Sequence, residues 1–180
     1  NRRSPPVFPS CVGVVTSRTG SVLQDIRNVI TRRYPLPILL AHTAVQGDGA
    51  HIQIAAAIRS LQGKADVIIV ARGGGSFEDL FEFNHPDVVR AIAASAVPVI
   101  SAVGHETDTT LADYAADRRV PTPSAAAETV VPDRSVLLHQ LEEMRRAIRD
   151  TVAGRFAAER STLAKLAERV EPSRLSRKLR

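Results

Sequence analysis

Residues 72–76, RGGGS, combine residue types that can hold a phosphate. Consecutive glycines let the backbone approach a ligand closely and turn its N–H groups toward an anion. The planar guanidinium of Arg72 matches two phosphate oxygens, and Ser76 can cap a helix that follows. The segment fits neither GxxxxGK[ST] nor GxGxxG, so neither nucleotide-binding fingerprint applies. The alternative interpretation is a tight turn in which Arg72 points into solvent. The candidate phosphate-binding residues here are Arg72, Gly73, Gly74, Gly75 and Ser76.

A second segment, GHETD at residues 104–108, carries groups that can move a proton. Asp108 follows His105 by three positions, and a carboxylate near an imidazole can fix its tautomer or favour its protonated form. His105 is therefore a candidate general acid or base. The spacing is not HExxH, which excludes the zinc-protease motif. The alternative is structural: Thr107 or Asp108 caps a helix that begins near Thr107, and His105 is an exposed loop residue.

Near-continuous apolar runs alternate with amphipathic segments through the first 116 residues. This alternation predicts an α/β fold with a Rossmann-like open parallel sheet flanked by helices, followed by a long C-terminal helix that enters a coiled coil. Ligands of such sheets bind beyond the carboxyl ends of the strands, so SRTG, QGDG, RGGGS and GHETD should converge at one edge. The strands are predicted at residues 11–16, 37–45, 66–71 and 98–103, and the helices at 21–34, 50–61, 77–83, 87–94 and about 107–116.

Other residues would reach the same edge of the sheet. Thr19 in SRTG is a candidate phosphate contact, and Arg118 and Arg119 are further candidates near the PTPS segment. Asp25 lies one turn into the first predicted helix. A lone helical aspartate is more often a solvated surface charge, so its position alone gives little reason to assign it a function.

The chain is expected to have three parts. Residues 1–9, rich in proline and arginine, form an extended linker, and residues 10–132 form the α/β domain. Residues 133–180 form a long helix, in which apolar residues recur mostly three or four positions apart. An additional step of four near Gly154 resembles a coiled-coil stutter, so this helix is predicted to need partner helices.

Composition narrows the classes of protein. A chain of 180 residues with 44% hydrophobic and 24% charged residues is globular. It has no apolar run of bilayer length and no signal peptide, and its single cysteine suits a reducing cytoplasm. The net charge of +5 arises after residue 132: residues 1–132 hold 12 basic and 12 acidic side chains, and residues 133–180 hold 12 and 7. Such a basic tail either attracts nucleic acid or is simply a solvated helix face. The scarcity of aromatic residues argues against a surface on which single-stranded bases stack.

Four motifs, in their order and spacing, resemble the large subunit of exodeoxyribonuclease VII. That family hydrolyses phosphodiester bonds of single-stranded DNA from both ends and releases oligonucleotides. The resemblance implies that an N-terminal OB-fold domain is missing here, and that the chain is the catalytic domain with the start of a coiled coil. It also implies that a small subunit binds to that coiled coil, and it allows homo-oligomerisation of the large subunit. It implies no membrane as a partner. The motifs are TSRTGSVLQDI, QGDG, RGGGSFEDLFEFN and SAVGHETDTTLADYAADRRVPTPSAAAE.

The resemblance also assigns site residues. It implies that Asp25, Arg72, His105 and Asp108 are catalytic, which raises Asp25 above what its position suggests. Metal dependence differs between members of the family, so Mg²⁺ is left open as a cofactor, with Asp25 and Asp108 as its ligands if it binds. The chain departs from the usual family residues at Arg18, Ala71, Phe81 and His85-Pro86, none of them a proposed catalytic residue.

The working hypothesis is phosphodiester hydrolysis. Arg72 and the glycine amides would hold the scissile phosphate, and His105, oriented by Asp108, would transfer a proton. Asp25 would be the complementary base or would join Asp108 in holding Mg²⁺. One alternative is a non-catalytic phosphate- or nucleotide-binding module assembled through the coiled coil. Another is an assembly subunit in which only the tail matters.

Overall fold

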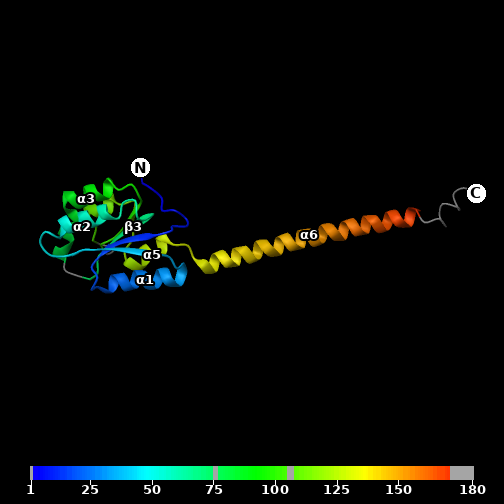
Figure 1. Cartoon of the computed structure of the whole chain (residues 1–180), viewed down its shortest axis with the longest axis horizontal. Coiled ribbons are helices and arrows are strands. Elements are labelled where there is room, and N and C mark those ends of the chain that lie inside the picture. Colours follow the sequence, from blue (N-terminus) through cyan, green and yellow to red (C-terminus); the bar gives the residue numbers. More distant parts are fainter. Residues whose placement is uncertain (1, 75–76, 105–107, 171–180) are drawn as a thin grey trace, which may run out of the picture. The chain divides into compact units, whose positions relative to one another are not determined.

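The computed structural model describes residues 2–74, 77–104 and 108–170. The chain divides into two compact units, Asn1–Arg134 and Ser135–Arg180. The first unit is a parallel sheet between two layers of helices, and the second is helical through residue 170 (Figure 1).

The sheet of the first unit has five parallel strands in the order β2-β1-β3-β4-β5. Every residue of β1, β3 and β4 is buried, because helices cover both faces of these central strands. The chain runs from β1 outward to β2 and then returns to the other side of β1 for β3, so the strand order reverses between β1 and β3. The strands are β1 Val12–Thr16, β2 Ile38–His42, β3 Val67–Ala71, β4 Val99–Ala102 and β5 Arg118–Arg119.

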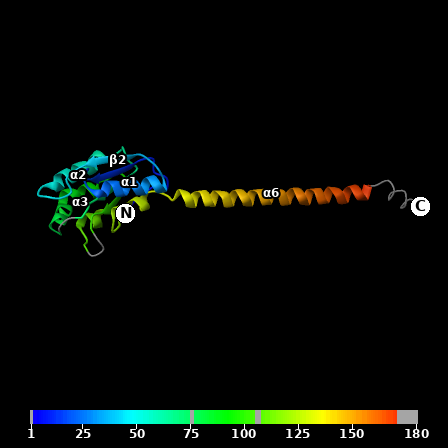
Figure 2. The ribbon, with the colours of Figure 1, turned by 90° about the horizontal axis from the view of Figure 1, so that it is seen from below.

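Helices α1 and α5 cover one face of the sheet, and α2 and α3 cover the other (Figure 1). Figure 2 shows the same layers from below, with α1 nearest the viewer. The apolar stripe of α1, which includes Ile26 and Ile30, packs on the sheet beside α5, whereas Phe83 and Ile92 belong to the opposite core. The helices are α1 Ser21–Arg33, α2 Ala50–Ser60, the 3₁₀ helix η1 Phe77–Asn84, α3 Pro86–Ala93, α4 Leu111–Ala115, α5 Pro123–Val130 and α6 Arg134–Val170.

The predicted fold class is confirmed: a parallel sheet flanked by helices is followed by a long C-terminal helix. The four strands predicted from apolar runs are all present. The fifth, Arg118–Arg119, was not predicted, because both side chains are exposed and its pairing with Ile100 and Ser101 of β4 uses only the main chain. The helical segment predicted at residues 77–83 is present as the 3₁₀ helix η1.

The N-terminal segment is held to the domain although residues 2–9 form no helix or strand. Its Arg3 donates to Asp117 from the main-chain N–H at 2.6 Å and from Nε at 3.1 Å. The same carboxylate accepts the N–H of Val99, at the start of β4. Burial raises the pKa of Asp117. The hydrogen bonds and charge of Arg3, together with the hydrogen bond from Val99, lower the pKa more, so it lies below the ordinary value.

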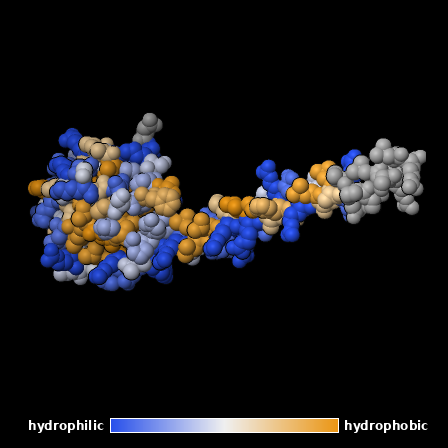
Figure 3. Space-filling model, turned by 45° about the vertical axis from the view of Figure 1, so that its right-hand side comes forward, coloured by the Kyte–Doolittle hydropathy of each residue, from blue (hydrophilic) through white to orange (hydrophobic). Residues whose placement is uncertain are grey.

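The second unit consists of α6 through Val170, and its apolar side chains are exposed in the single chain. Apolar and hydrophilic patches alternate along this helix in Figure 3. None of the helices in the described part of the chain is both long and apolar enough to cross a membrane. The exposed apolar residues of α6 are Val136, Leu138, Leu141, Met144, Ile148, Val152, Phe156, Leu163 and Leu166.

Candidate active site

A polar hollow lies where β1, β2 and β3 end. Its volume is about 590 Å³, and it sits at the point where the strand order reverses, which is where ligands bind in open α/β sheets. Three of the predicted phosphate-binding residues, Thr19, Gly73 and Gly74, line it together. Asp25, Arg72 and Asp108 are not part of its lining. The lining residues are Ser17, Thr19, Gly20, Ser21, Val22, His42, Thr43, Ala44, Val45, Gln46, Gln53, Gly73 and Gly74.

The first turn of α1 faces this hollow without a side-chain cap. The N-cap residue is Gly20, which has no side chain to accept the first N–H groups, and no acidic residue lies in that turn. Uncapped N–H groups and the positive end of the helix dipole favour an anion at this position. Ser21 and Val22 of this turn both line the hollow. The sequence predicted a helix from residue 21 and a phosphate contact at Thr19, and the structure adds that the uncapped first turn of this helix lines the hollow.

Gly73, the first glycine after β3, packs against that same turn. A Cβ at Gly73 would lie 3.2 Å from Cγ2 of Val22, so any larger residue would press on α1. A Cβ at Gly74 would meet no atom within 4 Å in the described part of the chain. The RGGGS segment thus contacts the start of α1. Gly75 and Ser76 lie outside the described residues.

Arg72 is buried, with 7% of its surface exposed. Its main-chain N–H donates to the carbonyl of Ala102 in β4, and its Nη2 lies 3.8 Å from Oδ2 of Asp79 in η1. A buried guanidinium requires such a partner, since the desolvation of an unpaired charge is costly. The alternative of a turn with Arg72 in solvent is therefore wrong. The arginine is instead fixed beside the hollow that Gly73 lines.

Asp25 is exposed on α1, one turn after Ser21. Among the residues that the structure describes, no hydrogen bond or ion pair engages its carboxylate. It lies near the end of α1 that contacts Gly73. The structure therefore leaves this carboxylate available to a ligand, although position alone does not distinguish it from a solvated charge.

After β4, Gly104 lies close to the main chain of Asp108. A Cβ at Gly104 would collide with the main-chain carbonyl of Asp108, so only glycine fits. Asp108 is half-buried, and its carbonyl accepts Nη2 of Arg119 at 3.4 Å. His105 lies outside the described residues.

Asp113 is a positioning residue that sequence reasoning missed. Its buried carboxylate accepts Oγ of Ser101 at 2.6 Å and both the N–H and the hydroxyl of Thr110 at 2.8 and 2.9 Å. Thr110 in turn accepts the N–H of Asp113, which completes a capping box. The helix therefore begins at Leu111 with Thr110 as its cap, and the expectation of a start near Thr107 is wrong. The signal was the TLAD pattern at residues 110–113.

Helix η1 is bonded to three other parts of the domain, a role that its sequence did not reveal. Asp79 pairs with Arg72, Glu82 accepts the N–H of His51 in α2, and Oδ1 of Asn84 accepts the N–H of Leu111 in α4 at 2.6 Å. Burial raises the pKa of Glu82, but hydrogen bonds from the main chain and ring of His51 and the nearby imidazoles lower it more, so its pKa falls below the ordinary value.

The family model described as "Exonuclease VII, large subunit" matches residues 1–180. This chain belongs to the exonuclease VII large subunit family. Curated relatives named exodeoxyribonuclease 7 large subunit agree with this. The relative from Ruminiclostridium cellulolyticum is 52% identical, and the match covers 92% of this chain and 42% of the relative. The relative from Thiobacillus denitrificans is 51% identical, and the match covers 94% of this chain and 38% of the relative. The Streptococcus gordonii relative is 48% identical over 97% of this chain and 41% of its own length.

Membership of the exonuclease VII large subunit family confirms the resemblance found in the motifs. The chain spans about two fifths of the length of these curated relatives. The catalytic roles stay predictions for all four residues, Asp25, Arg72, His105 and Asp108. The geometry limits them in one respect: Arg72, Gly73 and the start of α1 lie at one edge of the sheet.

Proposed function

We propose that this chain is the catalytic part of an exonuclease that hydrolyses phosphodiester bonds of single-stranded DNA, from both ends, to oligonucleotides. The observation that carries the proposal is the polar hollow at the strand-order reversal, where an uncapped helix N-terminus meets the glycines that follow Arg72. The printed names of the relatives, exodeoxyribonuclease 7 large subunit, support the reaction class.

The scissile phosphate would bind in this hollow. The N–H groups of Ser21 and Val22 and those of the glycines would donate to its non-bridging oxygens, with Thr19 adding a hydroxyl. Arg72, held by Asp79, would offset the charge that develops as the phosphorus becomes five-coordinate. Donors fixed before the reaction lose no energy by reorganising, so this arrangement favours the transition state over the bound strand.

His105 and Asp108 would handle the proton. In the sequence, His105 directly follows Gly104, whose Cα lies against the carbonyl of Asp108. His105 would take a proton from the attacking water or give one to the leaving oxygen, and Asp108 would orient it. Asp25 would act as the complementary base.

Mg²⁺ fits the same carboxylates as an alternative role. Asp25 has no partner among the described residues, and one or two carboxylates completed by water are a usual ligand set for Mg²⁺. Asp25 and Asp108 would hold the ion, and a bound Mg²⁺ would supply polarisation of a phosphoryl oxygen.

The partners proposed for the assembled enzyme are single-stranded DNA, the small subunit and further copies of the large subunit. The exposed apolar residues of α6 support helix partners, because a helix of this length in water buries them only against other helices. We place the assembly in the cytoplasm.

Single-turnover cleavage of labelled single-stranded DNA by the full-length large subunit with its small subunit tests the proposal. His105→Ala should reduce the rate on the order of 10² to 10⁴ fold, the usual contribution of a general acid or base. Asp48→Asn, an exposed residue of the QGDG turn at the same edge, serves as the matched control. A His105→Ala enzyme with the wild-type rate would refute the mechanism, and tight binding of DNA without turnover by the wild-type assembly would favour a binding module.

A further inference from the structure

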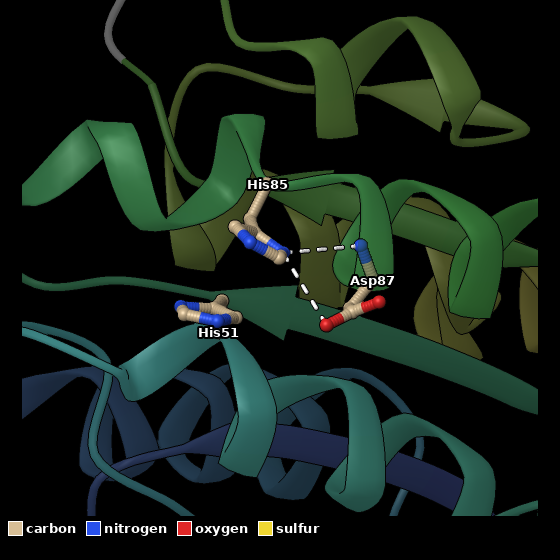
Figure 4. A group of neighbouring side chains, drawn as sticks. All are labelled: His51, His85 and Asp87. Carbon is tan, nitrogen blue, oxygen red and sulfur yellow. Dashed lines mark hydrogen bonds and ion pairs between the residues drawn. The ribbon is translucent and has the colours of Figure 1, made fainter.

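A second cluster of ligand-type side chains lies outside the candidate active site. His51 comes from the first turn of α2, and His85 and Asp87 come from the start of α3 (Figure 4). One potential ligand atom from each residue lies within 4.8 Å of the others. Within residues 2–74, 77–104 and 108–170, this is the one group of three His, Cys, Asp or Glu side chains that meets this criterion. Two helices that are separate in the sequence therefore bring two imidazoles and a carboxylate together.

The two imidazoles stack on each other. Their ring centroids are 3.6 Å apart, and the ring planes differ by 22°. Nδ1 of His85 accepts the N–H of Asp87 at 3.2 Å and lies 3.4 Å from its Oδ2 (Figure 4). The separation of 3.4 Å between Nδ1 of His85 and Oδ2 of Asp87 is close to that of two neighbouring ligands on one small cation, since each lies about 2.0–2.2 Å from the metal. A cation bound to Nδ1 would replace the N–H of Asp87 as the partner of that nitrogen.

The first imidazole is also oriented as metal-binding histidines usually are. Nδ1 of His51 lies 2.9 Å from Oε2 of Glu82, and the same oxygen accepts the main-chain N–H of His51 at 2.7 Å. A histidine that binds a metal through one ring nitrogen almost always donates the other N–H to a carboxylate or carbonyl. Glu82 would thus fix the tautomer that leaves Nε2 of His51 free.

We propose that His51, His85 and Asp87 form a binding site for one divalent transition metal of the Zn²⁺ class, with Glu82 as the outer carboxylate that orients His51. Two imidazoles and one carboxylate are ligands that Zn²⁺, Co²⁺ and Ni²⁺ prefer, whereas Mg²⁺ and Ca²⁺ take oxygen ligands. The side chains of His51, His85 and Asp87 are 18%, 40% and 46% exposed, which gives the ion and a water ligand a path from solvent. Rotation of the His85 ring about χ2, a broad torsion, would turn its nitrogen toward the ion, while Glu82 keeps the ring of His51 in place.

A metal at this position would join α2, η1 and α3. Glu82 and Asp79 both belong to η1, and Asp79 holds Arg72 beside the polar hollow. Ion binding would therefore stabilise the side of the domain that positions Arg72. The site itself does not depend on the proposed nuclease activity.

Titration of the full-length protein with Co²⁺ and Zn²⁺ tests the site directly. Visible absorption of Co²⁺ and competition with a chromophoric chelator for Zn²⁺ should both indicate one equivalent bound. Asp87→Asn, a change at a half-exposed position, and His85→Asn should each weaken binding at least about tenfold, and Glu82→Gln on the order of 10- to 100-fold. His139→Gln is the matched control, because His139 lies on α6 and pairs only with Glu143, four residues on.

Circular dichroism would establish that each variant is folded. If wild-type protein and the folded Asp87→Asn and His85→Asn variants bind Zn²⁺ equally, or if His139→Gln removes the binding, the site is refuted. Thermal unfolding is the second measurement. Zn²⁺ should raise the Tm of wild-type protein and of His139→Gln but not that of Asp87→Asn. An unchanged wild-type Tm at saturating Zn²⁺ would also refute the metal site.

Discussion

The exits of β3 and β4 are adjacent, yet their polar groups are used in opposite ways. After β4, Asp113 accepts three hydrogen bonds from Ser101 and Thr110, so these donors are satisfied within the protein. After β3, the glycines meet a helix that begins without a side-chain cap, so donors are left for a ligand. We therefore assign a positioning role to Asp113 after β4 and keep phosphate binding after β3 as the proposal to be tested.

Gly104 and Gly74 should differ most in stability when each is changed to alanine. A Cβ at Gly104 would meet the carbonyl of Asp108, which is backbone and cannot rotate away, so Gly104→Ala should cost about 3 kcal/mol. Gly74→Ala meets nothing within 4 Å and should leave the stability unchanged while weakening DNA binding. Urea unfolding of the two variants measures this, and equal stabilities would show that the β4 exit is not tightly closed.

Asp113 and Asp25 should divide stability from activity. Asp113→Ala leaves the hydroxyls of Ser101 and Thr110 without their buried acceptor, which should cost about 2 kcal/mol. Asp25→Ala removes an exposed carboxylate and should leave the stability within error but reduce single-turnover cleavage. Denaturant unfolding and cleavage assays on both variants test the division. An Asp113→Ala protein as stable as wild type would remove the positioning role assigned to that residue.

Asp79 should affect turnover through Arg72. Asp79→Asn weakens the ion pair at 3.8 Å and lets the guanidinium shift, so kcat should fall on the order of 10-fold with little change in KM for DNA. Asp79→Glu keeps the charge and should recover part of the loss. Steady-state kinetics of the full-length assembly measure this, and equal kcat values for Asp79→Asn and wild type would contradict the role.

Much of this arrangement was predictable from the sequence, and the rest was not for physical reasons. Apolar runs predicted the strands β1 to β4, and the rule of ligand sites at strand ends placed Thr19 with Gly73 and Gly74. The role of η1 was not predictable, because Asp79 and Glu82 resemble ordinary exposed acids until their partners are known. The cluster of Figure 4 depends on the packing of α2 against α3, which pattern alone does not reveal.

The smallest expected effect is on stability in acid and concerns Asp117, which lies at the end of the sheet opposite the hollow, beside the start of β4. The pKa of Asp117 is lowered in the folded state, so its contribution to stability is present above the ordinary carboxyl pKa of about 3.9 and is lost as the pH falls through the folded value. Asp117→Asn should therefore flatten the fall in stability below about pH 4 without changing DNA cleavage at neutral pH. Unfolding curves across that range measure it. An unchanged acid profile would mean that Arg3 does not anchor the N-terminal segment in solution.

Amide chemical shifts test the central claim most directly. On addition of a short 5′-phosphorylated oligonucleotide to full-length protein labelled with ¹⁵N, the N–H groups of Ser21, Val22, Gly73 and Gly74 should shift, and that of Thr110 should not. Shifts confined to the basic helix α6, with none at Gly73 or Ser21, would contradict a phosphate site at the exits of β1 and β3.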